Sequence, residues 1–368
     1  MRLDRLEPKN MQAKIIKHLC HYANWQGLKN LIIESGPDGT IISGDELGLN
    51  KHEWRLSPKR QAALLADLQE IMSLSGKTLG INKYYKIRHR DKEWTFYITA
   101  IKEGENQRII INFINKKPQL RPLTGLGLEK ADLNFIKKTL KARSGLIIVS
   151  APFNQGLSQS LYSLLNHLNA EHLNIYTLEN FLELKIKGIN QMLIKQANKA
   201  NYQKTLERLL RHDSEVIALM EVSQPEIWPL ALQAAHSGRL VLAGLKAERA
   251  ANVAKELKEH GSARLIKENL KLIISQRLVK RNCPKCLYKR SLNASDISLL
   301  SHKYKQIGPH LPKFVYETRG CRHCQNPDND LRVALFELVG PDYKKSLLAD
   351  ALLKLKNGLI SVEEMLKL

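Results

Sequence analysis

Short apolar runs alternate with amphipathic segments over roughly the last two thirds of the chain. The runs have the length of strands, and the segments between them carry apolar residues at helical spacing. This alternation predicts a largely parallel sheet covered by helices, which is an α/β fold. We expect strands at 146–150, 174–178, 216–220 and 240–243, and helices from 158, at 203–211 and at 226–236.

The first third of the chain has a different pattern. Three extended runs separated by polar turns predict an antiparallel meander at 84–90, 94–101 and 108–114. One helix is expected from the helical spacing of Leu64, Leu65, Leu68, Ile71 and Met72. This region is therefore predicted to be an α+β domain, and the prolines and glycines that follow it mark a linker.

These patterns predict five segments. They are a helical segment at 1–28, the α+β domain at 29–118, the sheet domain at 119–270, a cysteine-bearing subdomain at 271–340 and helices at 341–368. A chain of 368 residues is long enough for two domains and a small appendage. The first residues lack the apolar run of a signal peptide, and every apolar run is too short to span a membrane, so secretion is not expected.

The composition is that of a folded protein, with 43% hydrophobic and 26% charged residues. The formal net charge of +22 favours acidic partners, such as nucleic acid, a nucleotide or an anionic membrane face. Specific nucleic-acid binding is the weaker interpretation, because the basic residues are scattered and aromatic residues make up only 6%.

Two Cys-x-x-Cys pairs carry the most specific motif. Cys283 and Cys286 are followed, after 34 intervening residues, by Cys321 and Cys324. Two such turns can supply four thiolates to a zinc ion, and the site would be structural because no ligand position is left open. The alternatives are four unmetallated thiols or a redox pair. The lone Cys20 is interpreted as a packed thiol.

Residues 151–158 follow a predicted strand and open a predicted helix, which is the context of a phosphate-binding loop. In the pattern G-x-x-x-x-G-K-[ST], Gly156 and Ser158 are in register and Gln159 follows. Ala151 replaces the first glycine, and Leu157 replaces the lysine. Because the loops after parallel strands meet at one edge of a sheet, the loops after 150, 178, 220 and 243 should complete one site.

The segments around this loop resemble, in order, those of the ATPases of type II secretion and type IV pilus assembly. The resemblance covers about residues 120–340. It is carried by the loop strand and helix at 145–169, an acidic box at 174–179, the segments 188–191 and 209–221, a box at 233–242 in which Arg239 replaces a histidine, the run 275–281 before the first cysteine, and Glu337. It is weaker in the first domain, where Tyr97 and Asn112 stand at positions that are usually arginine.

The resemblance implies a RecA-like sheet domain, a PAS-like first domain and a small zinc-binding subdomain. It makes Glu179 and Glu221 candidates for water activation and metal contact, with ordinary salt bridging as the alternative. Without the loop lysine, which contacts the β- and γ-phosphates, loss of rate on the order of a thousandfold is expected. A neighbouring cation is the alternative source of charge, and the candidates are Lys246, Arg239 and Arg249.

The resemblance further implies a cytoplasmic protein that docks on an inner-membrane platform as a ring, usually hexameric. Our interpretation is a structural or regulatory subunit with little ATP or magnesium chemistry, which could share a ring with an active paralogue. The alternatives are a divergent active motor and a zinc-dependent nucleic-acid-binding protein. The sequence leaves open whether the machine builds pili, secretes protein or takes up DNA.

Overall fold

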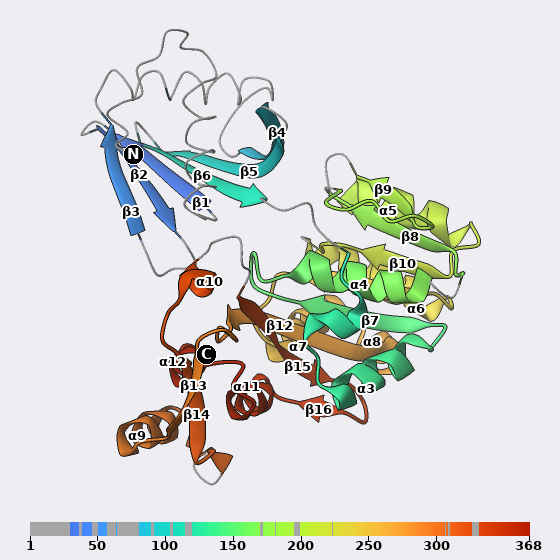
Figure 1. The fold of residues 1–368 in the computed structure, drawn as a ribbon. Helices are drawn as coiled ribbons and strands as arrows, with labels where there is room; N and C mark the ends of the chain where they lie inside the picture. The colour runs from blue at the N-terminus through green and yellow to red at the C-terminus, as the bar shows by residue number, and fades with distance from the viewer. Residues whose placement is uncertain are drawn as a thin grey trace. The chain divides into compact units, whose positions relative to one another are not determined.

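The computed structural model describes residues 30–36, 39–45, 51–56, 64, 81–89, 92–103, 106–114 and 120–368, except 170–171, 181, 195–198, 223, 306, 308–309 and 326–330. The chain divides into two units, Met1–Lys117 and Pro118–Leu368 (Figure 1). The predicted helical segment at 1–28, Cys20 and all but Leu64 of the predicted helix lie outside the described residues. No helix in the described ranges is both long and apolar enough to cross a membrane.

The first unit contains a six-stranded antiparallel sheet of order β3-β2-β1-β6-β5-β4. Its strands are β1 Asn30–Gly36, β2 Gly39–Asp45, β3 Lys51–Leu56, β4 Ile81–His89, β5 Lys92–Glu103 and β6 Asn106–Ile114. The last three strands confirm the predicted meander. Tyr97 and Asn112 are direct cross-strand partners, so the two replaced arginine positions fall at one point of the sheet.

The second unit is built on an eight-stranded sheet of order β16-β15-β12-β7-β11-β10-β8-β9. The six strands from β12 to β9 in this order run parallel, and β15 and β16 are antiparallel additions at one side. The strands are β7 Gly145–Ser150, β8 Ile175–Glu179, β9 Asn190–Leu193, β10 Val216–Leu219, β11 Leu240–Leu245, β12 Leu270–Lys280, β15 Arg332–Val339 and β16 Lys344–Lys345.

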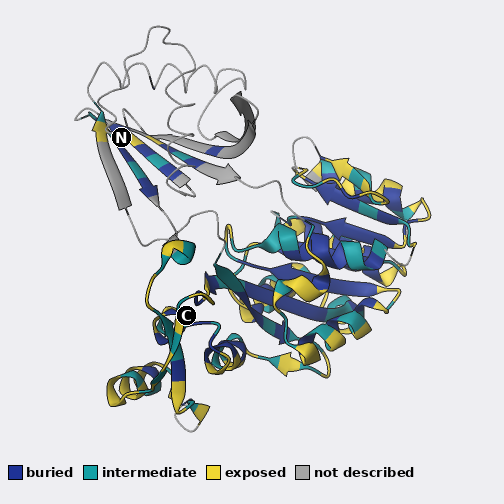
Figure 2. Ribbon diagram, in the orientation of Figure 1, coloured by how far each residue is buried: buried dark blue, intermediate teal, exposed yellow. Residues whose placement is uncertain are grey.

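Helices cover both faces of this sheet (Figure 1). They are η2 Leu123–Leu126, α3 Lys130–Leu140, α4 Leu157–Asn169, α5 Lys199–Leu210, η3 Pro225–Ile227, α6 Trp228–His236, α7 Ala250–His260 and α8 Ala263–Asn269. The central strands β7 and β11 are buried along their whole length, as expected for a parallel sheet between two helical layers (Figure 2). The α/β fold and the alternation predicted from the sequence are therefore confirmed.

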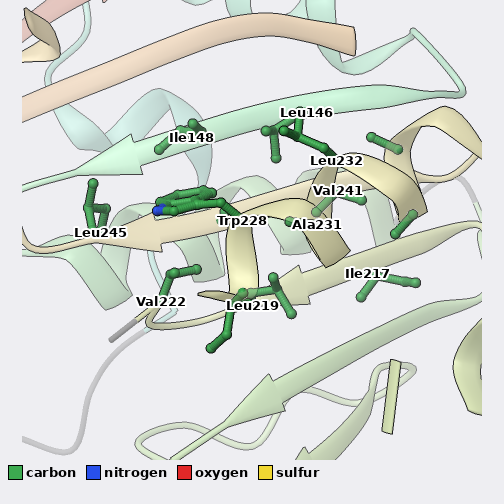
Figure 3. Close-up of a cluster of buried hydrophobic side chains, with 14 of the residues drawn as sticks. Leu146, Ile148, Ile217, Leu219, Val222, Trp228, Ala231, Leu232, Val241 and Leu245 are labelled. Carbon is green, nitrogen blue, oxygen red and sulfur yellow. The ribbon is translucent and has the colours of Figure 1, made fainter. Parts of the chain in front are cut away.

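Alternate residues of the strands pack into two separate hydrophobic cores, one on each face of the sheet. Leu146 and Ile148 face a cluster around the buried Trp228 of α6 (Figure 3). The intervening Ile147 and Val149 face the opposite cluster, which includes Leu161 of α4. The indole Nε1 of Trp228 donates to Glu256 Oε1 at 2.9 Å, so its polar atom is satisfied inside the core.

The residues predicted as a cysteine-bearing subdomain, 271–340, include two strands of the large sheet. The flanking strands β12 and β15 pair with each other and belong to the large sheet. Residues 281–331 form the insertion between them, with β13 Leu287–Ser291, α9 Ala294–Lys303, β14 Phe314–Thr318 and α10 Arg322–Gln325. It shares one core with the last helices, α11 Leu347–Lys356 and α12 Val362–Leu366, through residues such as Val315 and Leu355.

Candidate functional site

The backbone of the phosphate loop keeps the shape that its context predicts. The loop joins β7 to α4, and both Asn154, at φ 58°, and Gly156, at φ 87°, are left-handed. A Cβ at Gly156 would lie 2.9 Å from Nε2 of Gln276, and the left-handed backbone there favours glycine. Because the loop runs into the first turn of α4, its geometry still presents the amide groups of a helix N-terminus.

The side chains of the loop bring no cation. Leu157 is half-buried and packs against the core cluster on the α4 face of the sheet. Gln159, two residues further along α4, donates to Ser163 Oγ at 3.4 Å within the helix. A charge-assisted contact to phosphate is therefore absent at the lysine position.

Gln155 ties the loop to strand β12. Its side-chain Oε1 accepts from the Leu278 amide at 2.6 Å, and its backbone carbonyl accepts from Gln276 Nε2 at 2.7 Å. Gln276 in turn accepts a hydrogen bond from the Ser160 hydroxyl of α4. The chain thus fastens the loop with its own groups, and no sequence pattern predicts these hydrogen bonds because their partners are more than 100 residues apart.

Ser158, the residue at the magnesium position of the motif, donates its hydroxyl to Glu183 Oε1 at 2.8 Å. Burial raises the pKa of the Glu183 carboxyl, the Ser158 hydrogen bond acts against this shift, and the nearby charges of Glu179 and Glu221 raise the pKa further. The sequence analysis missed Glu183. Its signal was present, since it is an acidic residue four positions after Glu179, just beyond the acidic box.

Glu179 lies inside the protein, with 1% of its surface exposed. Its carboxylate accepts hydrogen bonds from Tyr162 Oη at 2.5 Å, Thr177 Oγ1 at 2.5 Å and Gln191 Nε2 at 2.9 Å. Burial, and then the charge of Glu179, raise the pKa of Tyr162, so this hydroxyl remains a donor. A carboxylate saturated in this way anchors α4 and β9 to β8.

Glu221 follows β10 and faces Lys246, which follows β11. The carboxylate Oε1 lies 2.6 Å from Lys246 Nζ, and both side chains are partly exposed. Lys246 Nζ also lies 5.3 Å from the centroid of the Phe153 ring at the tip of the loop. The loops after β7, β8, β10 and β11 therefore meet at one edge of the sheet, as expected.

The three candidate cations are not equivalent. Arg239 precedes β11 and donates to the carbonyls of Ser237 and Leu210, at the amino ends of the strands and away from the loop. Arg249 is the N-cap of α7, and its charge acts on Tyr304. Within this chain, Lys246 is the candidate that reaches the phosphate loop, and Glu221 already neutralises it.

The four cysteines of the two knuckles converge, as the sequence predicts. Their sulfurs all lie within 4.8 Å of one another, and no disulfide joins them. The pairs Cys283–Cys321, Cys286–Cys324 and Cys321–Cys324 are each 3.8 Å apart. A tetrahedral zinc thiolate with bonds of about 2.3 Å has sulfur–sulfur edges of about 3.8 Å. The donor set therefore fits a structural zinc ion held by Cys283, Cys286, Cys321 and Cys324.

The pKa values of the cysteines also favour a bound metal ion. Desolvation raises the pKa of Cys286 to about 12, whereas the backbone amide of Cys324 lowers that of Cys321 to about 7. Four thiolates at such short distances repel one another strongly. The cluster can be fully deprotonated at neutral pH only if a cation neutralises it, which is what a bound metal supplies.

Comparison with known proteins matches residues 85–355 to the family model of "Type II/IV secretion system protein". The type IV pilus assembly ATPase PilB of Acinetobacter baylyi is 27% identical over 301 residues, which cover 80% of this chain and 52% of the relative. The type II secretion system protein E of Pseudomonas aeruginosa is 26% identical over 299 residues, covering 80% and 59%. The chain thus spans little more than half the length of these relatives.

Two solved structures share the fold. The Legionella pneumophila ATPase DotB superposes with a TM-score of 0.65 at 18% identity, covering 98% of this chain and 96% of that one. The pilus retraction motor PilT, solved with bound ADP, gives a TM-score of 0.59 at 18% identity and covers 98% and 97%. The RecA-like fold expected from the sequence is thereby confirmed. With a family model matched over most of its length, the chain belongs to the type II/IV secretion system protein family.

Proposed function

We propose that this chain is a catalytically impaired member of its family, which acts as a structural or regulatory subunit of a type II secretion or type IV pilus machine. The observation that supports this most strongly is the charge balance at the phosphate loop. Glu179, Glu183 and Glu221 lie near the loop, whereas Lys246, the candidate cation that approaches the loop, is paired with Glu221. Phosphates carry several negative charges and would enter a site whose own charges are acidic.

Removal of one preorganised charge contact from a transferring group costs several kcal/mol, or on the order of a thousandfold in rate. Here the loop lysine is replaced by Leu157, and the side chain of Gln155 bonds to β12. Ser158 and Glu183 keep an oxygen pair that suits magnesium, but a magnesium ion in such sites is bound largely through the phosphates themselves. We therefore expect weak binding of Mg-ATP and negligible hydrolysis.

The rest of the proposal follows from the family. The chain would assemble into a homo- or hetero-oligomeric ring, usually a hexamer, on the cytoplasmic face of an inner-membrane platform. An intact scaffold around an impaired site favours a ring shared with an active paralogue. Light scattering of the protein alone and with such a paralogue tests this, and a strict monomer that binds no paralogue would contradict it.

The decisive test is calorimetric titration of Mg-ATP into the zinc-loaded protein and into its Leu157→Lys variant. We expect no binding by the unmodified protein at concentrations up to about 1 mM, and measurable binding once the lysine is restored. Leu353→Lys is the matched control, because Leu353 is 42% exposed on α11 and lies outside the loop. Micromolar binding by the unmodified protein would contradict the proposal.

The second candidate function is a divergent, active ATPase motor for pilus extension or protein export. The position of Lys246 favours it, since its Nζ lies 5.3 Å from the Phe153 ring of the loop. In that case a phosphate would take Lys246 from Glu221, and Lys246→Ala would abolish nucleotide binding. Lys255→Ala, at an exposed site on α7, is the control and should leave binding unchanged.

A further inference from the structure

The insertion that carries the cysteines has an exposed apolar recess that no part of the nucleotide chemistry uses. It has a volume of about 310 Å³ and lies between the start of α9 and the residues that directly precede β14. Its lining consists of Leu292, Ile297, Leu311, Pro312 and Lys313. Ile297 is 43% exposed, and the neighbouring Phe314 is 45% exposed, so this end of the insertion leaves large apolar side chains in water (Figure 2).

The recess is held in shape by backbone contacts and a capped helix. The Leu292 amide donates to the Lys313 carbonyl at 3.0 Å, which joins the two walls. Asn293 caps α9 by accepting from the Asp296 amide at 2.7 Å, and the Asp296 carboxylate accepts in turn from the Asn293 amide. One side chain from a partner could therefore enter a preformed apolar hollow.

The insertion that carries the recess is strongly positive. Residues 281–325 contain nine lysines and arginines but only two acidic residues, Asp296 and Glu317. Both acids are paired with Arg290, whose guanidinium lies 2.5 Å from each carboxylate. Lys313 lines the recess, and Lys289 Nζ lies 4.1 Å from the Phe314 ring centroid beside it. Even a zinc tetrathiolate, with a net charge of about −2, leaves this region basic.

We propose that this recess, defined by the five lining residues, docks an acidic segment of another protein that inserts one large apolar side chain. The apolar lining supplies the anchor site, and the surrounding lysines complement carboxylates that flank the anchor. Nucleic acid fits less well, because the hollow offers a hydrocarbon lining and no row of stacking rings. A membrane surface fits less well, because the apolar groups line a hollow rather than a continuous protruding face. The inference does not depend on whether the chain hydrolyses ATP.

The test is fluorescence anisotropy with a labelled peptide of about twelve residues, in which a central Leu-Phe pair is flanked by Asp and Glu. We expect binding to the zinc-loaded full chain with a Kd on the order of 10 µM. The same peptide with Ser in place of the Leu-Phe pair, or Gln in place of each Glu, should bind roughly tenfold more weakly. Equal binding of all three peptides would overturn the proposal.

Two variants locate the peptide. Ile297→Asp and Lys313→Glu alter exposed lining residues, so they should fold and keep their zinc, and each should weaken binding roughly tenfold. Leu353→Asp, on the exposed face of α11, should leave binding unchanged. The proposal is overturned if neither lining variant weakens peptide binding. It is also overturned if the recess binds an oligonucleotide or phosphatidylglycerol vesicles that the peptide cannot displace, and both variants abolish that binding.

Discussion

The cysteine knuckles and the phosphate loop are both tight turns marked by a short motif, but their polar groups have different partners. At the knuckles, four sulfurs lie within 4.8 Å of one another, in an arrangement that fits a metal ion. At the loop, the chain has bound its own groups, since Gln155 is held by Leu278, Ser158 by Glu183 and Lys246 by Glu221. The cysteines of the knuckles are arranged as a metal ion would require, whereas the side chains of the phosphate loop are bonded within the chain.

The difference follows from what each ligand does for folding. A metal in the knuckles would join the two ends of the β13–β14 hairpin, because one cysteine pair precedes β13 and the other follows β14. The phosphate loop is carried by β7 and α4, which are already secured by two hydrophobic cores. Loss of zinc would therefore cost structure, whereas loss of nucleotide affinity costs only function.

Removal of the metal is the largest expected effect and tests this asymmetry directly. A chelator, or Cys321→Ser, should expose the amides of β13 and β14 to hydrogen exchange, at a cost of several kcal/mol. The amides of β7 and β11 should keep their protection, because their cores do not include the insertion. The measurement is hydrogen exchange combined with zinc content per chain, which should be one.

Cys20→Ser is the control for this experiment, since it changes a cysteine outside the two knuckles. It should retain zinc and the protection of the hairpin. A metal-free protein whose β13 and β14 amides stay protected would break the comparison, because the knuckles would then be as independent of a ligand as the phosphate loop.

Removal of the charge on Glu183 is expected to stabilise the fold, whereas removal of the metal destabilises it, and the change in free energy of unfolding should be smaller. Burial raises the pKa of this carboxyl, so the folded protein binds its proton more tightly than the unfolded chain does. The resulting stability is present below the unfolded pKa and is lost as the pH rises through the raised folded pKa. Glu183→Gln should therefore raise the free energy of unfolding near neutral pH by about 1 kcal/mol and have no such effect at low pH.

Hydrogen exchange of the β7 and β11 amides at several pH values measures this difference. Glu259→Gln is the control, because Glu259 lies on the exposed side of α7 and pairs with Lys255 at 3.9 Å. It should change little at any pH. A stabilisation by Glu183→Gln that does not depend on pH would mean that the carboxylate is not desolvated. The loop would then repel a phosphate less strongly than we infer.

The sequence predicted the central sheet well, because β7, β10 and β11 are apolar runs buried on both faces. It did not assign β12 to that sheet, since β12 carries Ser275, Gln276 and Arg277 and so lacks a continuous apolar run. It also missed β9, a short edge strand whose residues are mostly exposed. Polar strands are recognised by their neighbours, which a single sequence does not show.

The candidate sites also contain residues that the sequence predicted and residues that it did not. The sequence predicted all four cysteines of the cluster, because metal geometry fixes the spacing within each Cys-x-x-Cys pair. Around the loop, the substitution at Leu157 was visible, but the partners of Glu179, namely Tyr162, Thr177 and Gln191, were not. These hydrogen bonds join α4, β8 and β9, and their partners follow no spacing in the sequence.

The smallest expected effect concerns Gln155, and it tests whether the loop is closed by the chain itself. Gln155→Ala removes the acceptor of the Leu278 amide, whose 2.6 Å hydrogen bond fastens the loop to β12. A partly buried amide left without its partner costs about 1 kcal/mol, so the Leu278 amide should exchange roughly fivefold faster. Gln203→Ala is the matched control, because the Gln203 side chain bonds only Glu207 on the exposed surface of α5 among the contacts described. If Gln155→Ala leaves the Leu278 amide protected, the loop is held by its backbone alone, as a loop kept ready for phosphate would be. The loop would then differ from the knuckles in the acidic charge near it, not in being fastened to β12 by Gln155.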